Sequence, residues 1–313
     1  MNQIVSRGHT RPLTEITFVR DGTDNTLLVS AAHDKLPQVR SGETGNWIGT
    51  FRGHKGAVWS CKVDSFTRTL AGTASGDFTA KLWSVQSGKE IIELKHKHVV
   101  KSFDFSYNSE LFATGCQDGL IRVYTTCQPE KDPVEIKVSN SGNDDGITKI
   151  SWLDENDATL IIVGKKNGII ETWDIRQASA TPCLVSSKLS PSAPIMDLEV
   201  NNNFNTILVS CGNKVVQLGS KDLTTKKEFV MPSTLTFSNE GGASLSPDGN
   251  RFICGGSDLW LREYDFHSGE IIQTYKGHHG PIRCVRYHPN GTIGASGSED
   301  ATIRFWNLED TEN

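Results

Sequence analysis

The stretch GHHGPIRCVRYHPNGTIGASGSEDATIRFW, from Gly277 to Trp306, contains the sequence markers of a unit that recurs along the chain. A glycine-histidine pair opens the unit, and Asp300 is followed six residues later by Trp306. Between these markers lie short apolar runs separated by residues such as the Asn-Gly pair at 290–291. Short runs bounded by Gly, Asn, Asp or Ser are typical of β-strands joined by tight turns.

Asp300 is the turn residue of this unit, and an acidic or amide residue at the same place can be followed through the whole chain. It stands at Asp34, Asp77, Asp118, Asn167, Asn213, Asp258 and Asp300, at intervals of 41 to 49 residues. An aromatic residue follows six positions later in five units, at Trp83, Tyr124, Trp173, Tyr264 and Trp306. A hydroxyl residue precedes the turn residue by four positions in four units, at Ser30, Thr73, Thr114 and Ser296. No segment has a helical period, so the pattern predicts only strands.

Four short strands per unit, with these markers, describe a blade of a WD-repeat β-propeller. Seven units predict an all-β, seven-bladed β-propeller that occupies residues 1–313 as one domain, with repeats at 8–306 and a short tail at 307–313. The last unit lacks a fourth strand. We therefore expect Gln3 to Arg7 to supply it, which closes the ring and leaves no free sheet edge at the seam.

Two sets of side chains fit a buried chain of hydrogen bonds in such blades. They are His54, Thr73, Asp77 and Trp83, and His278, Ser296, Asp300 and Trp306. A Ser/His/Asp catalytic set is the rival interpretation, but it requires one distinctive exposed constellation, whereas these sets recur at structural spacing. Histidines in separate blades do not converge on one metal ion. We expect no catalytic, metal or cofactor site, because no nucleotide-binding, metalloprotease or nucleophile-elbow motif occurs.

The composition is that of a soluble globular protein, with 36% hydrophobic and 22% charged residues and a net charge of −5. A nucleic-acid-binding protein usually has a basic excess, so no direct contact with nucleic acid is expected. The chain has no apolar segment long enough for a membrane span and no signal peptide. Its seven scattered cysteines include no CxxC pair, which is typical of a reduced compartment.

Residues at the start of the inner strands are the candidate partner-binding face. They are Arg11, Lys55, Trp59, His98, Lys101, His279 and Arg283. Arg and Trp are enriched in binding hot spots, and this basic rim would suit an acidic peptide segment. The alternative is that these are ordinary solvated residues. Units four to six lack the glycine-histidine pair, and the predicted loops 127–146 and 176–194 are further candidates for partner contacts.

Several segments resemble the serine-threonine kinase receptor-associated (unr-interacting) family of WD-repeat proteins. The similarity lies in GHTRPL (8–13), GETGNWIGTFRGHKGAVW (42–59), DFTAKLW (77–83), HKHVVKSFDF (96–105) and residues 275–306. It implies a non-catalytic adaptor, cytoplasmic and partly nuclear, that is a monomer within larger complexes. The implied partners are SMN/Gemin-type factors of spliceosomal ribonucleoprotein assembly (an mRNA-splicing role) or an RNA-binding translation regulator.

Three further interpretations stay open. The WD-repeat subunit of translation initiation factor three is a related propeller with different partners. An unrelated peptide-binding propeller and an enzyme that uses the central channel are the other two. The receptor-signalling role of the animal family is not transferred, and contacts of its acidic C-terminal extension are not transferred because Trp306 is followed here by only seven residues.

Overall fold

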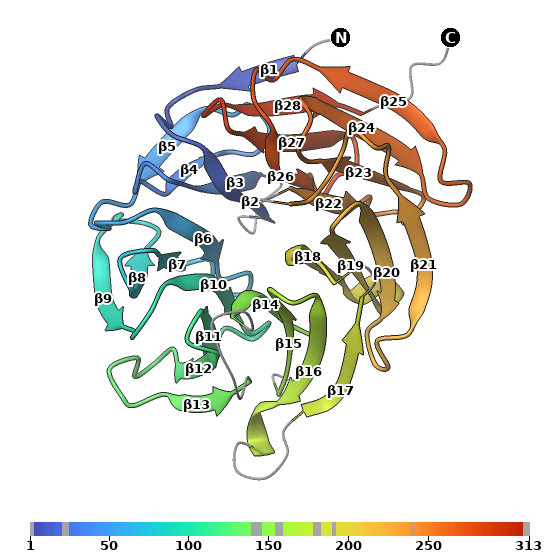
Figure 1. The fold of residues 1–313 in the computed structure, drawn as a ribbon. Coiled ribbons are helices and arrows are strands. Elements are labelled where there is room, and N and C mark those ends of the chain that lie inside the picture. The colour runs from blue at the N-terminus through green and yellow to red at the C-terminus, as the bar shows by residue number, and fades with distance from the viewer. Residues whose placement is uncertain are drawn as a thin grey trace.

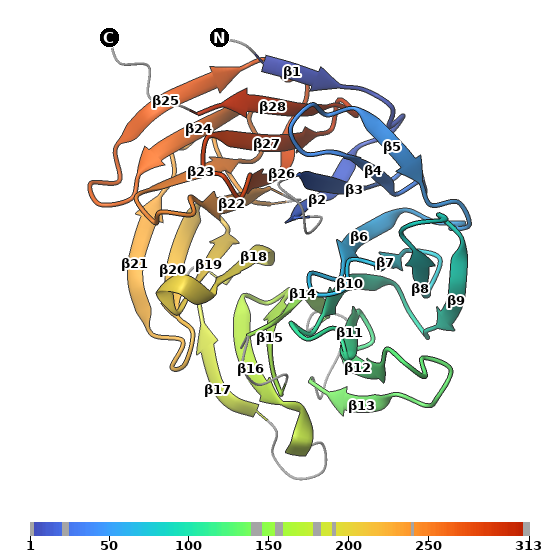
Figure 2. The ribbon, with the colours of Figure 1, turned by 180° about the vertical axis from the view of Figure 1, so that it is seen from behind.

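The computed structural model describes residues 3–20, 25–138, 146–153, 159–177, 183–189, 192–238 and 241–308. These residues form seven four-stranded antiparallel sheets, arranged as the blades of a ring around a central axis (Figure 1). The view from behind shows the same order of blades (Figure 2). The predicted seven-bladed β-propeller is therefore confirmed. The helices of the described residues are two single 3-10 turns, η1 (Ile175–Gln177) and η2 (Asn202–Phe204), and neither could cross a membrane.

Each blade runs from an inner strand near the axis to an outer strand at the circumference. Blade 1 comprises β2 (Leu13–Arg20), β3 (Thr26–Ala32), β4 (Gln38–Ser41) and β5 (Trp47–Thr50). Blade 2 comprises β6 (Val58–Val63), β7 (Leu70–Ser75), β8 (Thr79–Ser84) and β9 (Glu90–Lys95). Blade 3 comprises β10 (Val100–Phe105), β11 (Leu111–Cys116), β12 (Leu120–Thr125) and β13 (Val134–Lys137). Blade 4 comprises β14 (Ile147–Trp152), β15 (Leu160–Lys165), β16 (Ile169–Asp174) and β17 (Cys183–Lys188).

The remaining three blades follow the same plan, except that the last one is completed from the other end of the chain. Blade 5 comprises β18 (Ile195–Asn201), β19 (Thr206–Cys211), β20 (Lys214–Gly219) and β21 (Thr225–Val230). Blade 6 comprises β22 (Gly242–Leu245), β23 (Arg251–Gly255), β24 (Trp260–Asp265) and β25 (Ile271–Lys276). Blade 7 comprises β26 (Ile282–Tyr287), β27 (Ile293–Ser298), β28 (Ile303–Asn307) and β1 (Gln3–Ser6).

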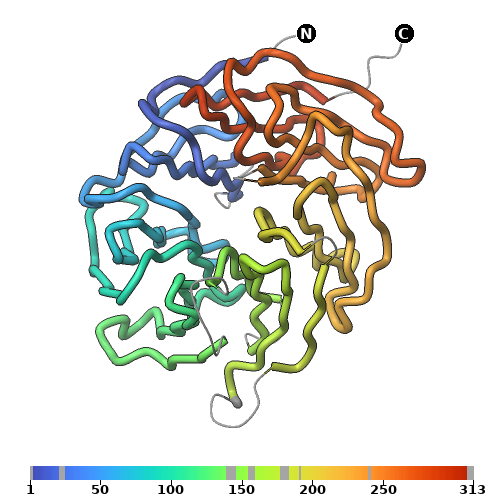
Figure 3. The backbone as a smooth tube through the Cα atoms, in the orientation of Figure 1, coloured from blue at the N-terminus to red at the C-terminus, as the bar shows by residue number. Residues whose placement is uncertain are grey.

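The N-terminal strand closes the ring, as predicted. β1 pairs with β28 in antiparallel register, with Gln3 opposite Trp306 and Ser6 opposite Ile303. The backbone trace shows the N-terminal strand lying against the last strands of the chain (Figure 3). Backbone hydrogen bonds between the two ends of the chain thus cover the exposed edge of β28.

Apolar side chains pack between neighbouring blades and form the core. In blade 2, Gly72 of β7 faces the ring of Phe103 from blade 3, and a Cβ at this glycine would overlap that ring. Phe103 itself is fully buried and stacks on Phe112 at 5.2 Å. The glycine is therefore required by a close approach between sheets.

The two predicted hydrogen-bond sets are found as continuous chains inside blades 2 and 7. Trp83 Nε1 donates to Thr73 Oγ1 (2.9 Å), which lies 2.7 Å from His54 Nε2, and His54 Nδ1 lies 2.9 Å from Asp77 Oδ2. An ionised carboxylate only accepts, so Nδ1 carries the proton and Nε2 accepts from the hydroxyl. The chain is satisfied from the indole to the carboxylate.

In blade 7, Trp306 Nε1 donates to Ser296 Oγ (2.8 Å), and His278 lies 2.7 Å from Ser296 and 3.0 Å from Asp300. Thr73 and Ser296 are fully buried, so these hydroxyls cannot meet a substrate. Burial alone raises the pKa of Asp77, but hydrogen bonds from His54, Thr79 and Lys55 more than offset this and hold the pKa below its ordinary range. These histidines are interior hydrogen-bonding groups of the scaffold.

The arrangement is incomplete in other blades. In blade 1, His9 lies 2.8 Å from both Ser30 and Asp34, but Arg40 stands where blade 2 has tryptophan. In blade 3, His96 contacts Thr114 at 2.8 Å, whereas Asp118 accepts a hydrogen bond from Arg122 instead.

Blades 4 and 5 are held together by an apolar cluster. It includes Ile162, Ile170, Ile195, Ile207 and Val209, all of which are buried. Burial of these aliphatic side chains stabilises the contact between the two blades.

The prediction that residues 127–146 and 176–194 are loops is wrong for the middle part of each segment. Strand β13 lies inside the first and β17 inside the second, and each forms the outer strand of its blade. The polar residues of these strands are consistent with an outer position, where side chains meet solvent. Residues 139–145, 178–182 and 190–191 of the two segments lie outside the described residues.

Candidate interaction site at the channel mouth

Six of the seven inner strands carry a β-bulge at the same place. The pairing with the second strand skips the second residue of each of these inner strands, as between Val58 and Ser60 in β6 or between Ile282 and Cys284 in β26. A bulge leaves the extra residue unpaired and redirects its side chain. The skipped residues are Thr14, Trp59, Lys101, Thr148, Met196 and Arg283, which we call the bulge ring.

All six members of the bulge ring line one cavity of about 110 Å³ on the central axis. The lining also includes Gly241, which directly precedes the inner strand of blade 6, so every blade contributes to it. The cavity is therefore one end of the central channel, and we call this end the channel mouth.

Aromatic and basic side chains gather on one side of the mouth. Lys101 Nζ lies 2.9 Å from the centroid of the Trp59 ring, which is a cation–π contact between blades 2 and 3. The His33 ring meets the same indole edge-on, with centroids 5.0 Å apart. On the other side of blade 1, an Arg283 guanidinium nitrogen lies 3.4 Å from Glu299 Oε1.

The surroundings of His33 show the electrostatic character of this side. Burial lowers the pKa of His33 below its ordinary value, and the positive charges of Arg283, Lys101 and Arg11 lower it further. Within the described residues, His33 Nε2 is buried without a hydrogen-bond partner. The mouth thus has a positive field that favours an anionic group.

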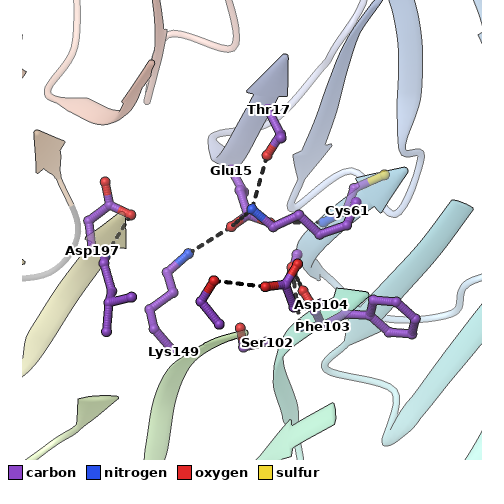
Figure 4. Close-up of polar contacts among 12 residues, drawn as sticks. Glu15, Thr17, Cys61, Ser102, Phe103, Asp104, Lys149 and Asp197 are labelled. Atoms are coloured by element: carbon purple, nitrogen blue, oxygen red, sulfur yellow. Dashed lines mark hydrogen bonds and ion pairs between the residues drawn. The ribbon is translucent and has the colours of Figure 1, made fainter. Parts of the chain in front are cut away.

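Below the mouth, charged side chains cross the channel. Glu15 of β2 accepts a hydrogen bond from Lys149 of β14 at 3.1 Å and lies 3.5 Å from Lys62 of β6, although blades 1 and 4 are not neighbours (Figure 4). Burial raises the pKa of Glu15, but Lys149 and Lys62 outweigh it and lower this pKa to about 2. The carboxylate is therefore ionised and paired.

A second pair crosses from blade 5 to blade 7. Arg286 donates to both oxygens of Asp197, at 2.6 and 2.8 Å. Burial lowers the pKa of Arg286, whereas Asp197 and Glu199 raise it well above its ordinary value. Bidentate pairing of buried groups gives a rigid geometry. Together with Glu15 and Lys149, this pair forms a floor of fixed charges beneath the mouth.

The structure divides the seven predicted face residues into two groups. Trp59, Lys101 and Arg283 belong to the bulge ring, and Arg11 is exposed close enough to shift the pKa of His33. Lys55, His98 and His279 are exposed and do not line the cavity at the mouth. The backbone amides of Lys55 and His279 donate to Asp77 and Asp300, and His98 packs on Phe78.

Sequence reasoning missed several residues of the mouth. They are Thr14, His33, Thr148, Lys149, Met196 and Gly241. A signal for the bulge ring exists, because each member follows the first buried aliphatic residue of its inner strand, as Trp59 follows Val58 and Met196 follows Ile195.

The side chains of the mouth can offer aromatic contacts and charges to a ligand. In the described part of the chain, no group of three His, Cys, Asp or Glu side chains is arranged to hold a metal ion. The mouth instead offers an aromatic ring, guanidinium and ammonium groups, and a rigid floor. Such a surface suits an acidic protein segment.

Comparison with known proteins places the chain among WD-repeat proteins. The family described as "WD domain, G-beta repeat" matches residues 45–84, 88–125 and 269–307. The serine-threonine kinase receptor-associated protein of Homo sapiens is 40% identical over 299 residues, which cover 96% of this chain and 80% of that protein. Its counterpart in Dictyostelium discoideum is 37% identical over 303 residues, which cover 97% of this chain and 98% of that protein. Eukaryotic translation initiation factor 3 subunit I of Drosophila melanogaster is 32% identical over 344 aligned positions. These cover 99% of this chain and 98% of that protein.

Proposed function

Since the chain belongs to the serine-threonine kinase receptor-associated protein family of WD-repeat propellers, we propose that it is a non-catalytic adaptor that binds an acidic segment of a partner protein at the channel mouth. The main support for this proposal is the bulge ring, which brings Trp59, Lys101 and Arg283 to one cavity. Loops and bulges on a rigid scaffold are where binding residues concentrate.

Charge supports an acidic partner. The cavity is lined by four cations and two anions, which leaves a positive excess of two charges; the cations are Lys101, Lys149, Arg283 and Arg286, and the anions are Glu15 and Asp197. The whole chain, in contrast, carries a net charge of −5. A local basic site in an acidic protein steers an acidic segment to one place on the surface.

We further propose that the adaptor works in ribonucleoprotein assembly, in the cytoplasm and partly in the nucleus, with SMN/Gemin-type factors or an RNA-binding translation regulator as partners. The support is the identity of 37–40% with the receptor-associated relatives over nearly the whole chain. The second candidate is a subunit of the translation initiation factor 3 complex, which the 32% identity with its subunit I supports more weakly.

Affinity capture from cell extract, followed by mass spectrometry, separates these functions. The experiment compares the wild-type chain with the double variant Lys101→Ala/Arg283→Ala and with the control Lys89→Ala/Lys137→Ala, whose lysines are exposed on the outer half of blades 2 and 3. We expect Gemin-type proteins with the wild type and the control but not with the mouth variant. Recovery of initiation-factor subunits would favour the second candidate, and equal recovery of one partner set by all three proteins would contradict binding at the mouth.

A further inference from the structure

One turn of the propeller carries a residue that its backbone conformation disfavours. The residue after the turn aspartate or asparagine has a positive φ in five blades, and it is Lys35, Phe78, Gly119, Gly168 or Ala301. Glycine adopts this conformation without strain, whereas a bulky side chain there is a clear outlier. Phe78 has a φ of 68° and is 45% exposed, so neither the turn nor the core requires a phenylalanine. Strain of this kind points to a function.

Phe78 lies at a second cavity, which is lined by residues of blade 2 and by His96 of the connection from β9 to β10. The ring of His98 packs against it, with centroids 5.7 Å apart and planes inclined by 32°. The cavity is about 340 Å³ in volume and is also lined by Lys55, Lys95, Asp77 and Glu93. Phe78, with the exposed His98 packed against it, thus lines a cavity with charges of both signs.

This second cavity is adjacent to the channel mouth. Trp59 Nε1 lies 3.3 Å from where a Cβ would stand on Gly76, two residues before Phe78. His98 and Lys101, which pack on Phe78 and Trp59 respectively, belong to one short segment leading into β10. Gly76 and Phe78 are two residues apart, a span of at most about 7 Å, so an extended peptide of a few residues could reach from the mouth to Phe78.

We propose that Phe78 and His98 form an aromatic shelf that binds an aromatic side chain of the same partner segment whose acidic residue enters the channel mouth. This inference rests on the proposed function and specifies the partner further, as a segment that combines acidic and aromatic residues. Offset or inclined packing on a phenylalanine ring gives an aromatic ligand an advantage over an aliphatic one.

A protein segment fits the shelf better than single-stranded RNA does. Stacking platforms for RNA lie along a groove of uniform positive charge that follows the phosphates. Here Asp77 and Glu93 line the same cavity as Lys55 and Lys95. Carboxylates at this position repel a phosphate backbone.

Fluorescence anisotropy with the full chain tests the shelf. The probes are two short fluorescein-labelled peptides with several aspartates, identical except that one carries a phenylalanine where the other has alanine, each made in both chain directions. The variants are Phe78→Gly, which suits the positive φ, and Phe78→Leu, which keeps apolar bulk. Ala301→Gly is the matched control, because it makes the same backbone change in blade 7 without loss of a ring.

We expect the wild type and Ala301→Gly to bind the phenylalanine peptide about three to ten times more tightly than the alanine peptide. Both Phe78 variants should lose this preference and bind the alanine peptide like the wild type. No preference in the wild type, or a preference that survives in Phe78→Gly, would overturn the shelf. Tighter, Phe78-dependent binding of an oligouridine probe would overturn it in favour of RNA.

The same assay separates the shelf from the proposed function. The variant Lys101→Ala/Arg283→Ala should weaken the binding of both peptides alike, since it removes the two cations that hold the acidic residues of the peptide. If it binds both as tightly as the wild type does, or if the wild type binds neither, the proposed function fails. If both peptides bind through the mouth but without discrimination, only the shelf fails.

Discussion

Lys101 Nζ lies 2.9 Å from the centroid of the Trp59 ring and joins blades 2 and 3 across the channel mouth. Both residues are β-bulges on their inner strands, so neither is engaged in the regular pairing with the second strand. The contact therefore holds an aromatic face and a positive charge at the mouth in a fixed arrangement. Fixed anchors reduce the entropy lost when a partner binds.

Replacing Trp59 should weaken partner binding much more than it weakens the fold. We expect Trp59→Ala to lower affinity at least about tenfold, as for a hot-spot tryptophan, because Lys101 loses its ring and the partner loses a contact surface. The control is Trp47→Ala, which removes a tryptophan that is 60% exposed on the outer strand β5. Titration calorimetry below the melting temperature measures both, and equal affinities of the two variants would contradict the assignment.

Replacing the interior histidines should have the opposite effect. His54→Ala and His278→Ala each break two hydrogen bonds of a buried chain. We expect a loss of about 2–4 kcal/mol in the free energy of unfolding and a melting temperature lowered by roughly 3–6 °C. Partner affinity, measured where both variants are folded, should stay within about twofold. A large loss of affinity with an unchanged melting temperature would mean that these histidines act at a binding site.

The channel floor predicts a pH dependence of stability. The pKa of Glu15 falls from its ordinary 4.5 to about 2 in the folded chain. A depressed folded-state pKa gives stability that is complete above the unfolded value and is lost as the pH falls from about 4.5 to 2. Glu15→Gln should therefore reduce the free energy of unfolding by about 3 kcal/mol at neutral pH, and this deficit should shrink below pH 4.5.

Urea unfolding at a series of pH values measures this deficit. Glu270→Gln serves as the control, because Glu270 is exposed on the loop before β25. A deficit for Glu15→Gln of constant size down to pH 2.5 would show that the carboxylate is not ionised and paired in the fold.

The close approach of blades 2 and 3 predicts a further effect on stability. Gly72→Ala places a methyl group where the Phe103 ring lies, so the sheets must move apart. Overpacking of this kind costs about 1–3 kcal/mol, and the melting temperature should fall. Gly49→Ala is a suitable control, since a Cβ there has no neighbour within 4 Å. If both variants melt at the wild-type temperature, the blades do not pack as described.

Fold and scaffold could be predicted from the sequence because their signals are local and repeated. Asp77 and Asp300 recur at blade spacing, and each lies within 25 residues of its histidine, so one sequence contains several copies of the same pattern. The channel mouth was predictable only in part. Trp59 and Arg283 follow glycine-histidine pairs, whereas Met196 stands in a unit without that marker.

Contacts across the channel were beyond sequence reasoning for a physical reason. Glu15 and Lys149 are separated by 134 positions and meet because the ring closes and both strands have a particular register. No local pattern encodes such a pair. The positive φ of Phe78 likewise depends on the turn geometry, which a DFT sequence does not reveal by itself.

Photo-cross-linking tests most directly whether the partner docks at the channel mouth. A p-benzoylphenylalanine is introduced in place of Arg11, at the mouth, or in place of Phe66, which is 62% exposed in the turn between β6 and β7 at the opposite end of the inner strands. With the captured partner present, we predict a covalent adduct from position 11 and none from position 66. An adduct from position 66 alone would contradict the account.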